Sequence, residues 1–263
     1  MLDIAKRISA SVSVFHDPQR DYAPRREPCT IADCVRTILN AGFGVETWLC
    51  QHHYAPLEED AIQALSQLCR HAEIVSAHTS TLTWSPEGLR AEIGLAARIG
   101  ADILVIHPNT LGLEKQAEPP TALELREICA FARDCGVMLA FENSGRTGIE
   151  MVRRAIDLVG AEPGATGMGI CIDTGHAHRS CTWEGIPVSA FLEEFRDLIV
   201  EVHVDDNFGA KDLHLPPGEG TLDWARVIPA IRSLPPNAVV CLEITTEGDP
   251  LQALAAAREF LCR

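Results

Sequence analysis

GVMLAFE (residues 136–142) and MGICID (residues 168–173) are two short apolar runs, and each ends in a carboxylate. Short apolar runs separated by a stretch with helical spacing are typical of parallel strands joined by a helix. Runs of the same kind recur along the chain, at 9–15, 44–50, 73–78, 102–107, 198–204 and 238–244. The pattern therefore predicts eight strand-plus-helix units.

The stretches between these runs carry the signals that begin and end helices. Thr30 precedes an amphipathic stretch and is followed by Asp33, the spacing of a capping box. Ser85 and Pro86 open the stretch 85–100, and Gly100 closes it. Ser at the N-cap, Pro at the first helical position and Gly just past the end are the residues expected at helix boundaries.

Eight such units in 263 residues match the size and rhythm of a (β/α)8 barrel. The structural alternative is a doubly wound open sheet, which would need a phosphate-binding glycine loop after an early strand. Neither GxGxxG nor GxxxxGK[ST] occurs in the sequence. Without a low-complexity tract or linker, we expect one barrel domain over residues 1–263.

The composition excludes several classes of protein. A formal charge of −15 disfavours long nucleic acids, because such binding depends on cationic groups that contact phosphates. No apolar run reaches the roughly 18 residues of a membrane span, and the start of the chain lacks a cleavable signal. The ten cysteines are scattered without a CxxC pair, which favours reduced thiols. We therefore expect a soluble, cytoplasmic protein.

The ends of the predicted strands carry the chemistry. In a barrel of this kind the active site lies at the C-terminal ends of the strands. Six successive runs carry metal-seeking side chains at or next to their ends. These side chains are His78, His107, Glu142, Asp173 with His176, His203 and Glu243. The connection after the seventh run is long for such a link and adds Asp212 and His214. Gly209, Gly218 and Gly220 would let it fold back over the strand ends.

Each of these residues taken alone has an ordinary structural explanation, such as a hydrogen-bonded rim histidine. Together they would crowd unpaired carboxylates into one place unless cations neutralise them. Nine imidazole and carboxylate ligands without a thiolate suit zinc, manganese or iron in a site with open positions.

The motifs FEN (141–143), DTGH (173–176), PPGEGTLDW (216–224) and LEI (242–244) resemble the xylose-isomerase-like barrel superfamily over essentially the whole chain. That superfamily includes sugar and sugar-phosphate isomerases and epimerases, together with endonuclease IV. Resemblance to the single-metal epimerases implies a site at Glu142, Asp173, His203 and Glu243.

Resemblance to the three-zinc endonuclease adds two further groups of ligands. Glu142 would bridge a metal on His78 and His107 to the metal already described, and a third metal would lie on His176, Asp212 and His214. The cofactor is then a divalent metal, with up to three zinc ions or manganese. The segment ENSGRTG (142–148) only half keeps the endonuclease pattern, and GEGTLDW (218–224) looks like the isomerases.

Two reactions fit these residues, and a metal-holding structural protein is a third alternative. The first is isomerisation or epimerisation of a small sugar, sugar phosphate or related polyol ketone through an enediolate. Glu142 and Glu243 come from strands three apart and are the candidate bases, with His176 as a further catalytic candidate. The alternative is phosphoester hydrolysis by clustered zinc ions, as in endonuclease IV.

Basic residues after the ligand-bearing strand ends are candidates for binding the substrate. Arg146, Arg179 and Lys211 could hold a phosphate or carboxylate of a small carbohydrate-like molecule. The loop 16–29 is long and rich in Pro and Arg, which suits either a lid or a contact in a homo-oligomer. Glu46 lies inside the second run, and the sequence indicates no partner for it.

Overall fold

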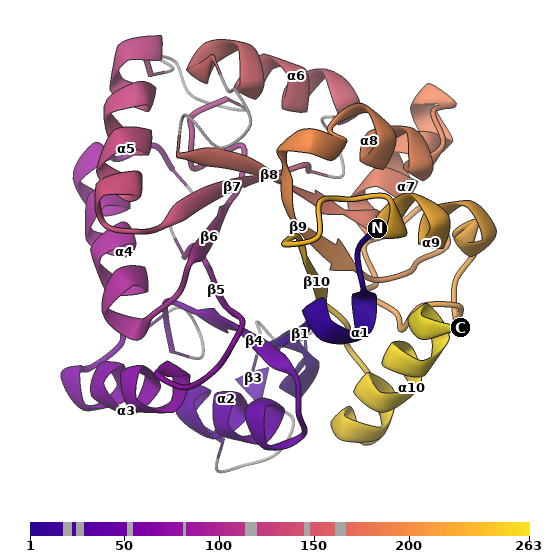
Figure 1. Ribbon diagram of the computed structural model, residues 1–263, viewed down its shortest axis with the longest axis horizontal. Helices are drawn as coiled ribbons and strands as arrows, with labels where there is room; N and C mark the ends of the chain where they lie inside the picture. Colours follow the sequence, from indigo (N-terminus) through magenta and orange to yellow (C-terminus); the bar gives the residue numbers. More distant parts are fainter. Residues whose placement is uncertain are drawn as a thin grey trace.

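The protein is a closed barrel of eight parallel strands, as the sequence predicts (Figure 1). The computed structural model describes residues 1–17, 23–24, 29–51, 55–80, 83–113, 120–144, 148–160 and 167–263. Around the barrel the order is β1, β10, β9, β8, β7, β6, β5 and β4, and β1 closes the ring by pairing with β4. The strands are β1 (Ile8–Ser11), β4 (Gly44–Trp48), β5 (Val75–His78), β6 (Ile103–Ile106), β7 (Met138–Glu142), β8 (Met168–Asp173), β9 (Ile199–Val204) and β10 (Val239–Leu242).

Helices surround this barrel on its outer side (Figure 1). The outer helices are α2 (Ile31–Asn40), α3 (Glu59–Cys69), α4 (Pro86–Ile99), α5 (Ala122–Asp134), α6 (Gly148–Val159), α7 (Thr174–Glu184), α8 (Val188–Glu194), α9 (Trp224–Arg232) and α10 (Pro250–Cys262). The predicted caps are present: Thr30 and Asp33 form a reciprocal capping box, and Gly100 ends α4 in the left-handed conformation. A short 3-10 helix, η4 (Arg196–Leu198), leads into β9.

The first predicted strand is shorter than the apolar run that suggested it. The strand β1 stops at Ser11, and Val12–Phe15 forms a 3-10 helix, η1. The Ser11 hydroxyl accepts a hydrogen bond from the backbone N–H of Ser13, which favours the tighter turn over an extended chain. A two-stranded hairpin follows, β2 (His16–Asp17) with β3 (Ala23–Pro24), and a short helix α1 (Ile4–Arg7) precedes β1. Most of the predicted lid or oligomer loop, 18–22 and 25–28, lies outside the described residues.

Two apolar clusters make up the core. The larger one lies between the barrel and the surrounding helices, with Phe141, Leu104 and Ile93 among its fully buried members. The smaller one fills the barrel and contains Val105, Ala140 and other short side chains. Side chains in a strand alternate between the two faces, so every second strand residue points into the barrel. Because of the same alternation, the polar residues at the strand ends also point toward the barrel axis.

The connection 205–222 folds back toward the strand ends. Asp206 and Leu215 exchange backbone hydrogen bonds of 2.8 and 2.9 Å, and Thr245 N donates to His214 O at 2.7 Å. Gly218 has a φ of 90°, which favours glycine. A side chain at Gly220 would come within 2.3 Å of an Asp206 carboxylate oxygen. Both glycines therefore allow the fold-back that the sequence suggests.

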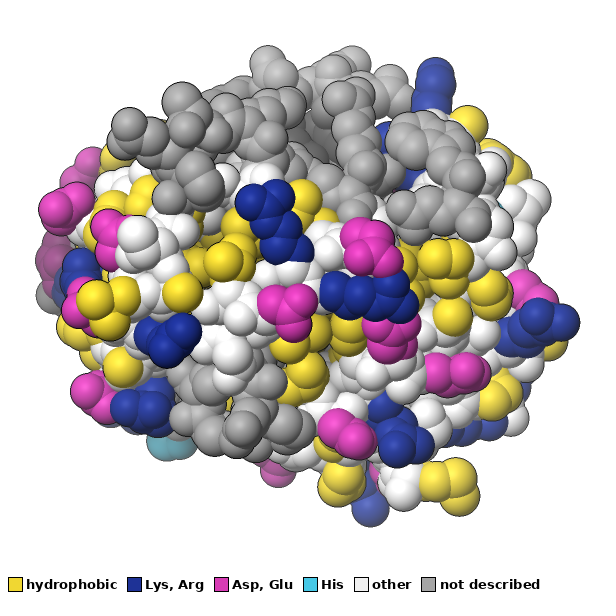
Figure 2. Space-filling model, turned by 90° about the horizontal axis from the view of Figure 1, so that it is seen from above, with side chains coloured by type: hydrophobic (Ala, Val, Ile, Leu, Met, Phe, Trp, Pro, Cys, Tyr) yellow, Lys and Arg dark blue, Asp and Glu magenta, His cyan; other side chains and the backbone are white. Residues whose placement is uncertain are grey.

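The surface seen in Figure 2 carries acidic and basic side chains that are interspersed, and neither charge gathers into a broad patch there. The structure holds all ten cysteines as free thiols. Among the described residues, no helix is both long and apolar enough to cross a membrane.

Candidate metal centre at the barrel mouth

The nine predicted ligands come together at the C-terminal ends of the strands. Asp173 and His203 are register partners at the ends of β8 and β9, and His78, Glu142 and Glu243 lie at or just beyond the ends of β5, β7 and β10. A pocket of about 210 Å³ opens above them. Its lining consists of Trp48, Cys50, His78, Thr79, His107, Glu142, His176, Asp212, His214 and Glu243.

Glu142 stands between two groups of histidines. Its Oε2 lies 2.9 Å from His107 Nε2 and 3.6 Å from His78 Nε2. Its Oε1 lies 3.1 Å from His203 Nδ1. One carboxylate thus faces both groups, which is the arrangement of a ligand that bridges two ions. Nδ1 of His78 lies 3.2 Å from the backbone oxygen of Thr79, which leaves Nε2 facing Glu142.

The second group surrounds His203, whose side chain is fully buried. Its Nδ1 lies 2.9 Å from Glu243 Oε2 and faces Glu142 on the other side. Its Nε2 lies 2.9 Å from Glu46 Oε2. With the proton on Nε2, the ring donates to Glu46 and turns the Nδ1 lone pair toward the strand ends. A carboxylate behind a ligating histidine fixes the ring and raises its basicity.

The third group draws on the folded-back connection. His176 Nδ1 lies 2.9 Å from Asn143 O, and His214 Nδ1 lies 3.0 Å from Glu243 O. Each ring can donate its Nδ1–H to a backbone carbonyl. Both Nε2 atoms then face Asp212, at 2.9 Å from Oδ2 for His176 and 3.8 Å from Oδ1 for His214. The two backbone contacts hold the rings in the orientation that a metal ligand needs.

These groups fit divalent ions. Within each of the sets His78–His107–Glu142, Glu142–Asp173–His203–Glu243 and His176–Asp212–His214, the ligand atoms lie within 4.8 Å of one another. Asp173 is fully buried, and its Oδ2 has no hydrogen-bond partner. Such an oxygen is costly to bury unless a cation contacts it. Nitrogen and oxygen donors of this kind suit zinc, magnesium or manganese.

Sequence reasoning left Glu46 without a partner and missed two further buried carboxylates near the mouth, Glu201 and Asp205. Glu46 contacts His203, and Glu201 accepts a hydrogen bond of 2.8 Å from Ser76 Oγ. Asp205 accepts from Gly175 N at 2.7 Å, and its other oxygen lies 3.6 Å from His214 Nδ1. The available signal was position: Glu201 lies two residues before His203, so it shares the inward-facing side of the same strand.

The predicted substrate-binding residues are not gathered in the same way. Arg179 lies beside the third group, with Nη1 3.5 Å from Asp212 Oδ2. Lys211 is exposed on the connection. Neither lines the 210 Å³ pocket. Arg146 lies outside the described residues.

Protonated imidazoles balance the carboxylates when no metal is bound. Burial disfavours the charged form of His78, but Glu142, Glu46 and Glu243 outweigh it and raise its pKa to about 9. Burial is likewise outweighed at His214, where Glu243, Asp205 and Asp212 raise the pKa to about 9. Burial raises the pKa of Asp173 to about 7. A metal ion therefore has to displace protons in order to bind.

We expect the metal-free protein to lose stability as the pH rises from about 6 to about 9. His78, His214 and Asp173 have pKa values above their ordinary 6.5, 6.5 and 3.8, so the folded state holds more protons than the unfolded state in this range. The stability that His78 and His214 contribute is fully present below pH 6.5. It is lost as the pH rises through their pKa in the folded state, about 9.

Thermal unfolding from pH 5.5 to 9.5, with and without chelator, measures this effect. Metal-loaded protein should show a much flatter profile, because the ions replace the protons. An equally flat profile for metal-free protein would contradict the described charge balance.

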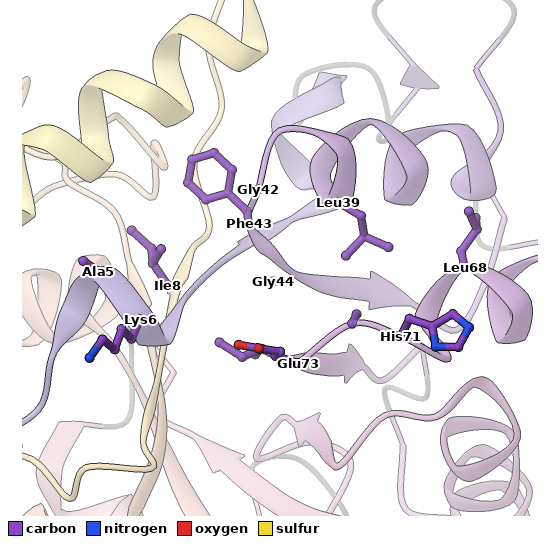
Figure 3. Close-up of a pocket in the computed structure, with 12 residues that line it drawn as sticks. Ala5, Lys6, Ile8, Leu39, Gly42, Phe43, Gly44, Leu68, His71 and Glu73 are labelled. Carbon is purple, nitrogen blue, oxygen red and sulfur yellow. The ribbon is translucent and has the colours of Figure 1, made fainter.

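A second hollow lies at the opposite end of the barrel (Figure 3). It has a volume of about 480 Å³ and is lined mainly by apolar side chains near the starts of the strands, including Ile8, Phe43 and Ile74. Lys6, His71 and Glu73 also belong to its lining. The three groups of metal-ligating side chains described above lie at the other end of the barrel.

The closed ring of parallel strands with helices outside it defines a (β/α)8 barrel, and side chains that could hold a metal lie at its mouth. Residues 35–263 match the model of the xylose isomerase-like TIM barrel family, and the chain belongs to that family. The resemblance inferred from the sequence is therefore confirmed.

Similar proteins include an uncharacterized protein, y4fM, from Sinorhizobium fredii, which is 29% identical over 55% of this chain. The match covers 48% of that relative, so the chain spans about half its length.

Structures with the same fold include sugar 3-epimerases. L-ribulose 3-epimerase is 17% identical, with a TM-score of 0.69 over 97% of this chain and 93% of that chain. The TTHB071 protein from Thermus thermophilus, in a crystal soaked with ZnCl2, is 21% identical, with a TM-score of 0.60 over 97% of both chains.

Proposed function

We propose that this protein is a metal-dependent isomerase or epimerase of a small sugar, sugar phosphate or related polyol ketone. The observation that carries the proposal is the placement of two carboxylates at the pocket, Glu142 and Glu243, which lie 3.1 and 2.9 Å from His203 Nδ1 and come from different strands. Their strands, β7 and β10, are separated by β8 and β9. The two side chains can therefore approach one substrate carbon from different directions, as epimerisation requires.

A divalent ion would be held by Glu142, Asp173, His203 and Glu243. When bound, it would polarise a substrate carbonyl and stabilise the negative charge that develops when the neighbouring C–H proton leaves. The protein's own groups supply the proton transfer. Burial opposes ionisation of Glu142, but His107, and after it His203 and His78, lower its pKa well below the usual range and keep this carboxylate ionised.

Glu243 is the more accessible of the two proposed bases. Its side chain is 12% exposed, against 1% for Glu142. Burial opposes ionisation, but His203 and His214 lower its pKa to about 2. His176, our further catalytic candidate, lines the same pocket. The pocket volume of about 210 Å³ lies below the 300–1,000 Å³ typical of drug-sized ligands, which suits a small polyol.

The proposal predicts exchange of a carbon-bound proton with solvent. Metal-loaded protein incubated in D2O with ketoses, aldoses and inosose-like ketones should place deuterium next to the carbonyl of at least one compound. Chelation should abolish the exchange.

A second candidate is phosphoester hydrolysis by clustered zinc ions, as in endonuclease IV. The observation in its favour is the third group, His176, Asp212 and His214, since multinuclear sites can activate water and hold a leaving oxygen. The charge of −15 argues against DNA as the substrate.

A further inference from the structure

Below the ligands at the mouth, a second layer of polar side chains lies inside the barrel, at the next inward-facing position of the strands. Glu201 precedes His203 by two residues on β9, and Cys241 precedes Glu243 by two residues on β10. Strand alternation therefore points both side chains into the barrel beneath the proposed metal ligands. Glu46 from β4 completes this layer, and all three residues are 0% exposed. We call Glu46, Glu201 and Cys241 the inner cluster.

Each carboxylate of the inner cluster has one oxygen held and one oxygen free. Glu46 Oε2 lies 2.9 Å from His203 Nε2, and Glu201 Oε1 accepts a hydrogen bond of 2.8 Å from Ser76. Glu46 Oε1 and Glu201 Oε2 are buried without a hydrogen-bond partner. Ligand atoms of the inner cluster and of His203 all lie within 4.8 Å of one another. Two buried oxygens without a hydrogen-bond partner and a buried thiol thus belong to one enclosed cluster.

The surroundings offer little positive charge to this pair of carboxylates. Short apolar and thiol side chains, including Val105, Ala140 and Cys171, fill the barrel around them. In the described part of the chain, no Lys or Arg forms an ion pair with Glu46 or Glu201. His203 is the one ion-pair partner of Glu46 there.

We propose that the inner cluster binds its own divalent cation of the zinc class, with Glu46 Oε1, Glu201 Oε2 and Cys241 Sγ as ligands. A mixed set of two oxygens and one sulfur suits zinc or cobalt better than magnesium or calcium. Binding converts the Cys241 thiol to a thiolate and releases its proton. Because the cluster is fully buried, the ion enters as the chain folds and acts as a structural site. It would be present whether or not the mouth acts on a sugar.

The sulfur ligand makes this ion distinguishable from those at the mouth. All nine proposed mouth ligands are nitrogen or oxygen donors. Protein produced in cells supplied with cobalt should show a thiolate-to-cobalt charge-transfer band in the near ultraviolet. Replacing Cys241 by Ser, or Glu201 by Leu, which offers no ligand atom, should remove the band together with about one cobalt equivalent. The control is Cys50→Ala, because Cys50 lines the mouth pocket and is the thiol there that could mimic the signal.

Circular dichroism establishes that each variant is folded, and the wild-type spectrum alone already tests the proposal. A band that is lost in Cys241→Ser and retained in Cys50→Ala supports the inner ion. Cobalt-loaded wild-type protein without the band would overturn the proposal. Glu46 and Glu201 would then share a proton instead of binding an ion. A band that survives in Cys241→Ser would also overturn it. Neither result depends on sugar exchange, so failure of the proposed function is detected separately.

Discussion

Replacing Glu243 by Gln should slow deuterium exchange at the substrate carbon by about 10²- to 10⁴-fold, the usual contribution of a positioned general base. The Gln amide oxygen can still coordinate a metal, but the amide cannot accept a proton at neutral pH. Most of the bound metal should therefore remain, as measured by elemental analysis of the purified variant. Loss of exchange with retention of metal would separate proton transfer from metal binding.

Glu247→Gln is the matched control, because Glu247 is exposed only four residues further along the chain. It should exchange at the wild-type rate. If Glu243→Gln exchanged as fast as wild type while fully loaded with metal, Glu243 would not be the base.

The three groups of ligands should be separable by mutation. His214→Ala should remove about one metal equivalent and leave the fold intact, because His214 belongs to the connection and is only partly buried. His203→Ala should be far more damaging. Its ring is fully buried between Glu46, Glu142 and Glu243, and its removal leaves three carboxylates without their shared partner.

Metal content and thermal unfolding of the two variants measure this difference. His71→Ala serves as the control, since His71 is exposed at the opposite end of the barrel. Unchanged metal content in both His214→Ala and His203→Ala would contradict the proposal that the mouth binds more than one metal ion.

The fold was predictable because its signals are local. Eight apolar runs, the Thr30–Asp33 capping box and the terminal Gly100 each depend on neighbouring residues alone. The exception is η1, where a side-chain hydrogen bond from Ser13 N to Ser11 Oγ accompanies a change from strand to 3-10 helix. Hydrophobicity alone does not reveal such a contact, because Val12 and Val14 are buried in the 3-10 helix too, as apolar residues of a strand would be expected to be.

The positions of the proposed ligands were predictable for a different reason. In a parallel barrel all strands end at the same rim, so residues far apart in sequence, such as His78 and Glu243, must lie near each other. The orientation of each side chain was not predictable. Glu46 shows why: its partner His203 lies 157 positions away on a strand that does not neighbour its own. Only the closed barrel brings the two side chains together.

Deuterium exchange compared with cleavage of an abasic-site duplex tests the central claim most directly. The metal-loaded protein is given the panel of sugars and polyol ketones in D2O and, separately, the duplex at low salt, where electrostatic binding of DNA is strongest. The account predicts deuterium next to the carbonyl of at least one compound, loss of that exchange with chelator, and an intact duplex. Nicking of the duplex without exchange into any sugar would contradict it and identify the mouth as a phosphoester hydrolase.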